Sequence, residues 1–240
     1  MQNQPATSTS PRAAADYAAH EGRMPRRILM ISMPLAFVFL LCWPSAGPLF
    51  RLHNAGSGSM APTLQPGQHF VSSRWSYGYS RYSFDWFELP ITGRIPAAAP
   101  TYGDIVTFRH PQVRKIMYVK RVVGLPGDRI QMVNGRLVIN DTATERRQIA
   151  SLPDPAPSGT RRAVQAYVEI LPNGTSHRII ETDGDAGSLD NTALFTVPPD
   201  HLFMLGDNRD NSLDSRVAGN VGGIGFVLLE LVIGKAVLVF

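Results

Sequence analysis

Short apolar runs separated by turn-forming residues fill most of the chain after residue 51. β-Branched and aromatic residues gather at 69–71, 105–109, 116–123, 137–139, 167–171 and 202–205, with clusters of Pro, Gly, Asn and Asp between them. These runs predict strands, because branched and aromatic side chains pack well on a pleated surface. No strong amphipathic helical pattern occurs in this region, so the sequence predicts a mainly β fold.

Two local patterns between these runs predict a turn and a loop. Asn134-Gly135 separates the runs 130–133 and 136–139. This dipeptide predicts a hairpin with a type I′ turn, because both of its residues readily adopt positive φ. Residues 141–165 are polar and carry three prolines between 153 and 157, so they predict a long loop.

The C-terminal region is apolar but does not predict a membrane helix. Glu230 and Lys235 interrupt it, and glycines are frequent within it. The runs 227–231 and 234–240 therefore predict buried strands. A chain that ends on such a strand is expected to pair it within a sheet.

One long apolar stretch precedes the β region. No charge occurs between Arg27 and Arg51, so the uncharged stretch 28–50 has 23 residues. That length suits a transmembrane helix, which needs roughly 20 residues. A cleaved secretory signal with a small-residue site at 45–47 is the alternative, but the apolar core of such a signal is usually only about 7–15 residues long. The sequence favours a retained anchor.

The basic residues indicate the orientation of this anchor. The chain has a formal net charge of +4, and residues 1–27 carry four arginines against two acidic residues. Arg26 and Arg27 directly precede the apolar stretch, which places the N-terminus in the cytoplasm and the residues from Arg51 onward on the outer, periplasmic face. Because half of the net charge lies in this tail, we expect no nucleic-acid partner.

Cysteine and lysine are both scarce. Cys42 is the single cysteine, which excludes an internal disulfide and a zinc site built from cysteines. The 23 basic residues include only three lysines, at positions 115, 120 and 235. Arginine keeps its proton in proteins, so among the long basic side chains only these three can act as neutral bases.

The first candidate for chemistry is the segment 56–64, which reads GSGSMAPTL. Glycines beside serines allow close backbone approach, which suits a nucleophile whose neighbouring amides must receive an oxyanion. A flexible linker is the alternative. Pro62 and the Pro66-Gly67 turn favour a defined shape over a linker.

The second candidate is a lysine within an apolar row, in the segment 118–128. Residues two apart share one face of a strand, so Tyr118, Lys120 and Val122 face the same way. Burial at this position would lower the pKa of Lys120 from about 10.4 and make it a general base near neutral pH. The alternative is an exposed lysine whose stem packs along the sheet.

The third candidate is the polar segment 205–216. Its acidic residues and arginines predict an internally bonded scaffold, with Asp214 close to Arg216. An EF-hand calcium loop starting at Asp210 is rejected, because Ser215 stands in place of the glycine and Val221 in place of the glutamate. The chain also lacks G-x-S-x-G, S-x-x-K, H-E-x-x-H and P-loop motifs, and its histidines form no recognisable constellation.

Four segments together closely resemble the ordered sequence boxes of bacterial type I signal peptidases. They are 57–64, 102–111, 118–128 and 206–216, which read SGSMAPTL, YGDIVTFRHP, YVKRVVGLPGD and GDNRDNSLDSR. As in that family, they follow an apolar anchor. The resemblance implies a serine endopeptidase, without metal or cofactor, that uses a Ser/Lys dyad to remove signal peptides from exported preproteins after small residues.

The resemblance implies catalytic roles for four residues. Ser59 would be the nucleophile, and Lys120 would be the general base that takes its proton. Ser57 and the backbone amide of Ser59 would form the oxyanion hole. Ser212 would orient the lysine.

Five further residues take supporting roles in the same resemblance. Asp214 and Arg216 would form an ion pair near the site, and Asp207 would belong to the same structural loop. Met60 and Tyr118 would line the substrate cleft. Ala55-Gly56 and His53 depart from the aliphatic residues and proline that are common at these positions in the family, which affects the expected shape of the pocket.

The implied fold is an antiparallel β-sheet catalytic core with an inserted smaller β subdomain, preceded by one N-terminal transmembrane helix. The expected parts are a cytoplasmic basic tail (1–27), the anchor (28–50), the first part of the core (51–131), the insertion (132–200) and the second part of the core (201–240). The aromatic stretch 74–87 either packs in the core or meets the lipid bilayer, since Trp and Tyr beside Arg suit a membrane interface.

Two other functions remain as alternatives. One is a specialised relative, either a peptidase of a conjugative-transfer system or a self-cleaving Ser/Lys regulator. The anchor and the lack of a DNA-binding helix pair disfavour the regulator. The other is a catalytically inactive, anchored β-domain that binds partners.

Overall fold

The computed structural model describes residues 47–85, 87–154 and 163–240. The basic tail and nearly all of the expected anchor lie outside these residues, as does Trp86 of the aromatic stretch. None of the helices in the described ranges has the length and apolarity needed to cross a membrane. Phe50, expected as the last residue of the anchor, is instead the first residue of strand β1 (Phe50–Asn54), because it pairs with Ser73 of the neighbouring strand.

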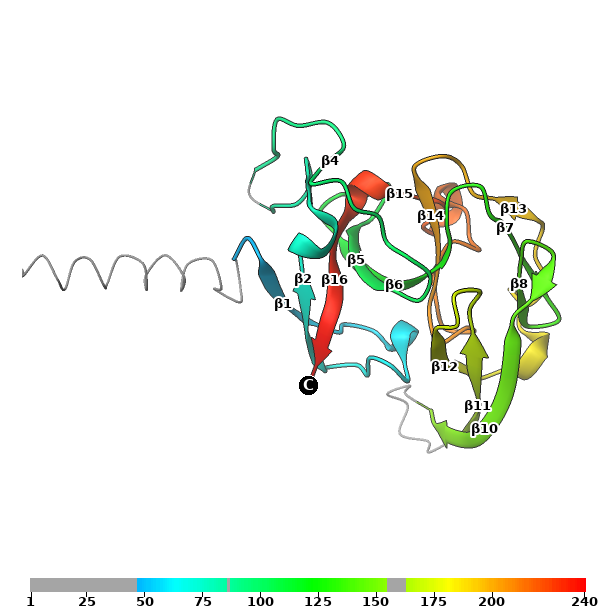
Figure 1. Ribbon diagram of the computed structural model, residues 1–240. Helices are drawn as coiled ribbons and strands as arrows, with labels where there is room; N and C mark the ends of the chain where they lie inside the picture. Colours follow the sequence, from blue (N-terminus) through cyan, green and yellow to red (C-terminus); the bar gives the residue numbers. More distant parts are fainter. Residues whose placement is uncertain (1–46, 86, 155–162) are drawn as a thin grey trace, which may run out of the picture. The chain divides into compact units, whose positions relative to one another are not determined.

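A seven-stranded sheet forms the larger part of the molecule, with the order β1-β2-β16-β5-β6-β14-β15 (Figure 1). Its pairs are antiparallel. Besides β1, its members are β2 (His69–Ser73), β16 (Val232–Val239), β5 (Ile105–Arg109), β6 (Met117–Gly124), β14 (His201–Leu205) and β15 (Val227–Leu228). The sheet therefore joins the first and last parts of the described residues, and the C-terminal strand lies between β2 and β5.

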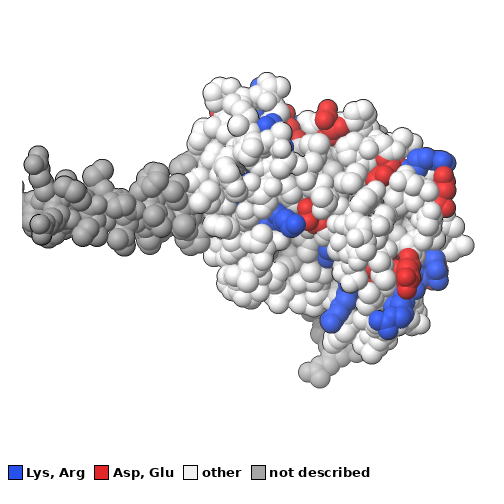
Figure 2. Space-filling view, viewed as in Figure 1, with Lys and Arg blue, Asp and Glu red and all other residues white. Residues whose placement is uncertain are grey.

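Strands between these two parts build two smaller sheets. The three-stranded sheet has the order β10-β11-β12, with β10 (Glu145–Pro153), β11 (Ala163–Ile170) and β12 (Ser176–Glu181). The four-stranded sheet has the order β13-β7-β8-β9, with β13 (Phe195–Thr196), β7 (Arg129–Val133), β8 (Arg136–Ile139) and β9 (Thr142–Ala143). The expected boundary at residues 131 and 132 therefore falls within β7. The pair β3 (Tyr79–Ser80) and β4 (Arg94–Ile95) completes the strands of the described residues. On the face shown in Figure 2, basic side chains lie among acidic ones, and most of the surface belongs to other residues.

The mainly β prediction is confirmed, since the helical elements within the described ranges are 3-10 turns of three residues. They are η1 (Gly58–Met60), η2 (Trp75–Tyr77), η3 (Gly184–Ala186), η4 (Gly219–Val221) and η5 (Leu229–Leu231). The β7–β8 hairpin is also confirmed, with φ of 49° at Asn134 and 72° at Gly135. Both residues adopt positive φ, as a type I′ turn requires.

Two predictions about strands are wrong. Residues 145–153 form β10 instead of a long loop, because their alternating side chains pack on β11, where Ile149 and Leu152 cover an apolar cluster around Ala166 and Ile180. The C-terminal strand is only partly buried. Val237, Leu238 and Phe240 expose half or more of their surface.

The apolar core lies against both faces of the large sheet. One cluster includes Phe108, Val122 and Leu231, and a second cluster joins Phe203 to Ile130 and Leu137 of the four-stranded sheet. Each fully buried side chain of this size stabilises the fold by roughly 1.5–3 kcal/mol. The second cluster packs the strands of the four-stranded sheet against β14, the strand that leads into the polar loop 206–216.

Candidate active site

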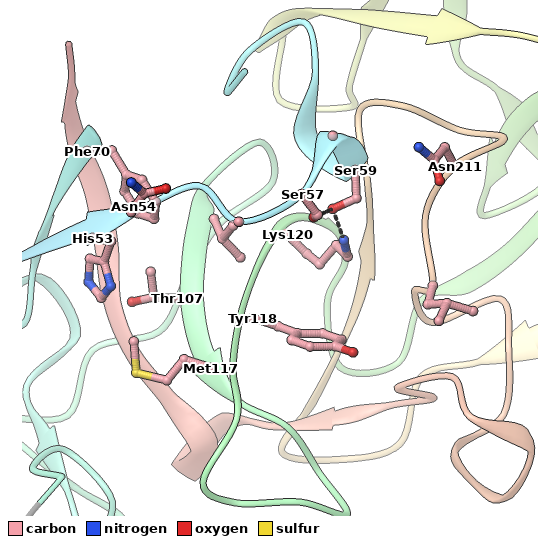
Figure 3. A pocket seen from close by; sticks show the side chains of 14 residues that line it. His53, Asn54, Ser57, Ser59, Phe70, Thr107, Met117, Tyr118, Lys120 and Asn211 are labelled. Carbon is pink, nitrogen blue, oxygen red and sulfur yellow. Dashed lines mark hydrogen bonds between the residues drawn. The ribbon is translucent and has the colours of Figure 1, made fainter. Parts of the chain in front are cut away.

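A cavity of about 450 Å³ opens beside the serine-rich turn (Figure 3). Residues from β1, η1, β2, β5, β6 and the loop after β14 line it. Ser57, Ser59, Lys120 and Tyr118 lie together at one end, while His53 and Phe70 lie toward the other (Figure 3). The structure thus gathers the first, second and third candidate segments of the sequence around one space.

Ser59 is held by the η1 turn at the wall of this cavity. Its backbone carbonyl accepts a hydrogen bond of 3.1 Å from the amide of Asn208, and the Asn208 side chain donates to the Gly58 carbonyl at 3.1 Å. A Cβ atom at Gly206 would collide with the Ser59 carbonyl. Glycine at position 206 therefore allows the loop 206–216 to approach the serine turn closely.

Lys120 points from β6 toward Ser59 (Figure 3). Its Nζ donates a hydrogen bond of 2.5 Å to Ser59 Oγ, and only 4% of its surface is exposed. Burial lowers the pKa of Lys120 to about 8, although Asp214 and Asp207 act in the opposite direction. A lysine with this pKa has a substantial neutral fraction near neutral pH and can accept a proton from the adjacent hydroxyl.

Ser57 and Tyr118 lie at the same end of the cavity. Ser57 Oγ is 3.2 Å from Ser59 Oγ, so its hydroxyl lies next to the expected nucleophile. Tyr118 lines the cavity from β6, two residues before Lys120. The alternation along β6 thus places Tyr118 and Lys120 on the same face, as the sequence predicted.

Asp214 and Arg216 form the expected ion pair, and both side chains are buried. Arg216 donates from Nε and Nη2 to the two oxygens of Asp214, each at 2.9 Å. Burial by itself would raise the pKa of Asp214, but Arg216 outweighs it and holds this pKa below its usual value. Asp214 also accepts a hydrogen bond from the Gly206 amide at 3.2 Å. Asp214 therefore links the beginning of the loop 206–216 to Arg216 at its end.

Asp207 makes a contact that sequence reasoning missed. Arg121 donates from Nε and Nη2 to its two oxygens, each at 2.7 Å, and Thr63 donates to it at 2.5 Å. Arg121 follows Lys120 in β6 and points to the opposite face. Asp207 therefore joins the serine segment, the lysine strand and the loop 206–216 through one buried carboxylate.

A second buried ion pair was also missed. Arg209 donates to the two oxygens of Glu169 in β11, at 3.2 and 2.5 Å, and His177 Nε2 lies 3.4 Å from the same carboxylate. The signal in the sequence is a glutamate within the apolar run 167–171, since a charged group in such a run needs a partner. This pair joins the loop 206–216 to the three-stranded sheet.

Two expected contacts are absent. Met60 does not line the cavity, because the η1 turn directs it into a cluster with Leu64 and Phe70, where 1% of its surface is exposed. The expected hydrogen bond between Ser212 and Lys120 is not formed. Ser212 is buried, but its Oγ has no hydrogen-bond partner among the described residues.

His53 occupies the far end of the cavity, where the resemblance leads us to expect an apolar residue. Its Nε2 lies 2.7 Å from Ser72 Oγ, and its ring stacks on Phe70 with centroids 4.9 Å apart. Burial, together with the charges of Arg51 and Arg74, lowers the pKa of His53 to about 4. The ring is therefore neutral at pH 7, and the pocket gains a polar group without a charge.

Comparisons with known proteins found a matching family and related sequences. The family model described as "Signal peptidase, peptidase S26" matches residues 26–240. A Signal peptidase I of Rickettsia canadensis (strain McKiel) is 39% identical over 187 residues, covering 75% of this chain and 67% of that protein. A Signal peptidase I of Rickettsia conorii (strain ATCC VR-613 / Malish 7) is 37% identical over 213 residues, covering 84% and 76%.

A solved structure was also found. The crystal structure of a signal peptidase I from Enterococcus faecalis V583 shares 22% sequence identity, covering 57% of this chain and 97% of that chain, with a TM-score of 0.32. The assignment of the chain to a family rests on the family model and on the relatives that are 37–39% identical, and not on this solved structure. The chain belongs to the signal peptidase family, peptidase S26.

Proposed function

We propose that this protein is a serine endopeptidase that removes N-terminal signal peptides from exported preproteins, with Ser59 as the nucleophile and Lys120 as the general base. The observation that carries the proposal is the 2.5 Å contact between Lys120 Nζ and Ser59 Oγ at the wall of a cavity. Family membership supports the reaction, and the relatives that match most of the chain carry the name Signal peptidase I.

The reaction begins when neutral Lys120 takes the proton of Ser59 Oγ as this oxygen attacks the scissile carbonyl carbon. The carbonyl oxygen becomes an oxyanion, which the Ser57 hydroxyl and the Ser59 amide stabilise. The carbon–nitrogen bond then breaks, and Lys120 returns the proton to the leaving amine. In the second half of the reaction, Lys120 takes a proton from a water molecule as the water oxygen attacks the acyl carbon. The bond between this carbon and Ser59 Oγ then breaks, Lys120 returns the proton to Ser59 Oγ, and the signal peptide is released.

The buried polar residues around the dyad position it. Asp214 and Arg216 stiffen the loop 206–216, and Asp207 ties that loop to the serine and lysine segments. Ser212 is proposed to orient Lys120 once substrate is bound. Its buried hydroxyl, which has no hydrogen-bond partner among the described residues, supports this role, since a rotation of the Ser212 side chain costs it no existing bond.

The substrate is proposed to lie as an extended strand along the cavity, with small side chains at the −1 and −3 positions. An extended peptide bound in this way places alternate side chains toward the pocket. The cavity has a volume of about 450 Å³ and has to hold the peptide backbone as well as these side chains. This favours small side chains at the two positions.

Digestion of purified preproteins by the full chain tests this proposal. Mass spectrometry of the products should show one new N-terminus per preprotein, directly after a small residue with another small residue two positions before it. Cleavage of conjugative pilin precursors alone, with exported preproteins left intact, would instead favour the specialised relative. No cleavage of either class would favour the inactive binding domain.

The rate of cleavage should depend on the protonation of Lys120. Only neutral Lys120 can take the proton of Ser59, and its pKa is about 8. We therefore expect kcat/KM to rise with pH through an acid limb centred near pH 8, and to fall about tenfold per pH unit well below it. Initial rates between pH 5 and 10 measure this limb. A limb centred near 6.5, the usual pKa of histidine, would contradict lysine as the base.

We also propose that the apolar residues 28–46 anchor the protein in the bacterial cytoplasmic membrane by a single span, with the N-terminus in the cytoplasm and the catalytic domain on the outer face. The length of the uncharged stretch and the arginines before it support this orientation. Phe50, Leu52 and Trp75 expose 39%, 38% and 57% of their surface, which suits contact with lipid beside the anchor. Flotation with liposomes of the full chain, but not of a chain that begins at Gly47, tests the anchor.

A further inference from the structure

A cluster of three carboxylates lies outside the catalytic cavity. Glu181 ends β12, Asp190 follows the η3 turn, and Asp210 belongs to the loop after β14. One oxygen of each lies within 4.8 Å of those of the other two. Glu181 and Asp190 are fully buried, and Asp210 is partly buried. Three carboxyl groups from three separate segments therefore lie close to one another.

The buried oxygens in this cluster lack protein partners. Neither oxygen of Glu181 accepts a hydrogen bond from any described residue, and the same holds for Asp190 Oδ1. The closest cation to Glu181 is Arg146, whose Nη1 lies 3.5 Å from Glu181 Oε1. That guanidinium already donates to both oxygens of Asp185, at 2.7 and 2.8 Å. A buried carboxylate without a hydrogen bond is costly, so Glu181 requires a partner that the chain does not supply.

The neighbouring arginines do not neutralise the cluster. Arg209 is paired with Glu169 at 2.5 Å, and Arg216 is paired with Asp214 at 2.9 Å. Burial is the main cause that raises the pKa of Glu181, to about 8, and the pKa of Asp190 is also raised. The region therefore carries more buried negative charge than its arginines balance, which favours binding of either a proton or a metal ion.

The backbone packs closely around these carboxylates. Asp190 Oδ2 accepts from the Gly187 amide at 2.6 Å, and Asp210 Oδ2 accepts from the Asp183 amide at 2.7 Å. A Cβ atom at Gly187 would collide with Asp210 Oδ1. Gly187 has φ of −65°, so this glycine is needed for space and not for its backbone conformation.

We propose that Glu181, Asp190 and Asp210 bind a structural Ca²⁺ ion that joins the loop 182–190 to the catalytic loop 206–216. Ca²⁺ prefers carboxylate oxygens at about 2.3–2.6 Å and accepts irregular geometry, whereas Mg²⁺ requires a near-ideal octahedron and retains several waters. The three ligands come from distant positions in the chain, unlike the continuous loop of an EF-hand. The ion lies outside the cavity and takes no part in the chemistry of Ser59 and Lys120.

Calorimetric titration of the EDTA-treated full chain in detergent tests the site directly. We expect one Ca²⁺ to bind per chain, and saturating Ca²⁺ to raise the midpoint of thermal unfolding by roughly 5 °C. MgCl₂ at the same concentration should give a smaller shift. No binding heat and no shift with Ca²⁺ would overturn the proposal, and an equal shift with Mg²⁺ would overturn the choice of Ca²⁺.

Amide variants of the ligands locate the site. Asp190→Asn and Asp210→Asn should each weaken Ca²⁺ binding at least about tenfold, because each removes a charged ligand. In EDTA the same variants should unfold at or above the temperature of the parent protein, since they relieve repulsion between carboxylates. Gly187→Ala should also weaken binding by crowding Asp210. Unchanged Ca²⁺ affinity in both Asp190→Asn and Asp210→Asn would overturn the proposal.

A matched control is Asp141→Asn. Asp141 is exposed and pairs with Arg129 at 2.7 Å on the surface, far along the chain from the three ligands. Its Ca²⁺ affinity should equal that of the parent protein. Equal loss of affinity in Asp141→Asn and Asp210→Asn would show non-specific screening of charge and would overturn the site.

Discussion

Replacement of Ser59 or Lys120 by alanine is expected to lower the rate of preprotein cleavage by at least about 10³-fold. Ser59→Ala removes the attacking oxygen, and Lys120→Ala removes the only cationic group that donates to it in the described structure. Neither change opens a large cavity in an apolar cluster, so both variants should fold. Product formation followed by mass spectrometry, with circular dichroism as the check on folding, measures the effect.

Lys120→Arg sharpens this prediction. Arginine keeps the positive charge and a long side chain but does not release its proton, so a charge-only role would be rescued and a general-base role would not. We expect Lys120→Arg to be as inactive as Lys120→Ala. The exposed Lys115 and Ser176 provide control substitutions to alanine, which should retain full activity. Substantial cleavage by Ser59→Ala or Lys120→Ala would refute the dyad.

Removal of the Asp207 carboxylate should destabilise the protein strongly. Asp207→Ala leaves the buried guanidinium of Arg121 with only one of its three 2.7 Å hydrogen bonds, the one to the Gly103 carbonyl, and leaves Thr63 without its carboxylate acceptor. Breaking a buried pair in this way typically costs about 3–5 kcal/mol of the free energy of unfolding. Urea denaturation measures this loss, and the midpoint of thermal unfolding should fall by about 10 °C.

The exposed pair Arg129–Asp141 provides the control for this experiment. Its N–O distance is also 2.7 Å, but 48% and 66% of its side chains are exposed. Solvent screens such a pair, so Asp141→Asn should change the free energy of unfolding by no more than about 1 kcal/mol. Asparagine is the suitable replacement because Asp141 has φ of 65°, which alanine adopts less readily. Equal losses in Asp207→Ala and Asp141→Asn would mean that burial of the Asp207 pair has no effect on stability. The N–O distance is 2.7 Å in both ion pairs, so a difference between the two losses of stability would reflect their difference in burial.

Local patterns sufficed to predict the features that depend on near neighbours. The hairpin at Asn134-Gly135 depends on two residues that accept positive φ, and the inward face of Lys120 depends on alternation along one strand. The contact of Lys120 with Ser59 spans 61 residues of sequence, and it was predicted because the ordered boxes resemble a known family. Periodicity alone would not have paired these two residues.

Features that depend on packing between distant elements were not predictable. The strand β10 is polar in sequence and becomes a strand because β11 offers it a partner and an apolar face. Asp207 and Arg121 are 86 residues apart, and no local pattern indicates their contact. Met60 was assigned to the cleft by resemblance to the family, but the direction of its side chain is set by the three-residue η1 turn.

The two faces of β6 have a consequence for insertions and deletions in this strand. Lys120 contacts Ser59 on one face, and Arg121 contacts Asp207 on the other. A shift of register by one residue sends every side chain of a strand to the opposite face. Deletion of a single residue upstream in β6 would therefore present Arg121 to Ser59 and Val122 to Asp207. Insertion of one residue would instead present Val119 to Ser59 and Lys120 to Asp207. A change of length in β6 therefore disturbs both contacts at once, whereas a substitution of Lys120 or Arg121 disturbs one of them.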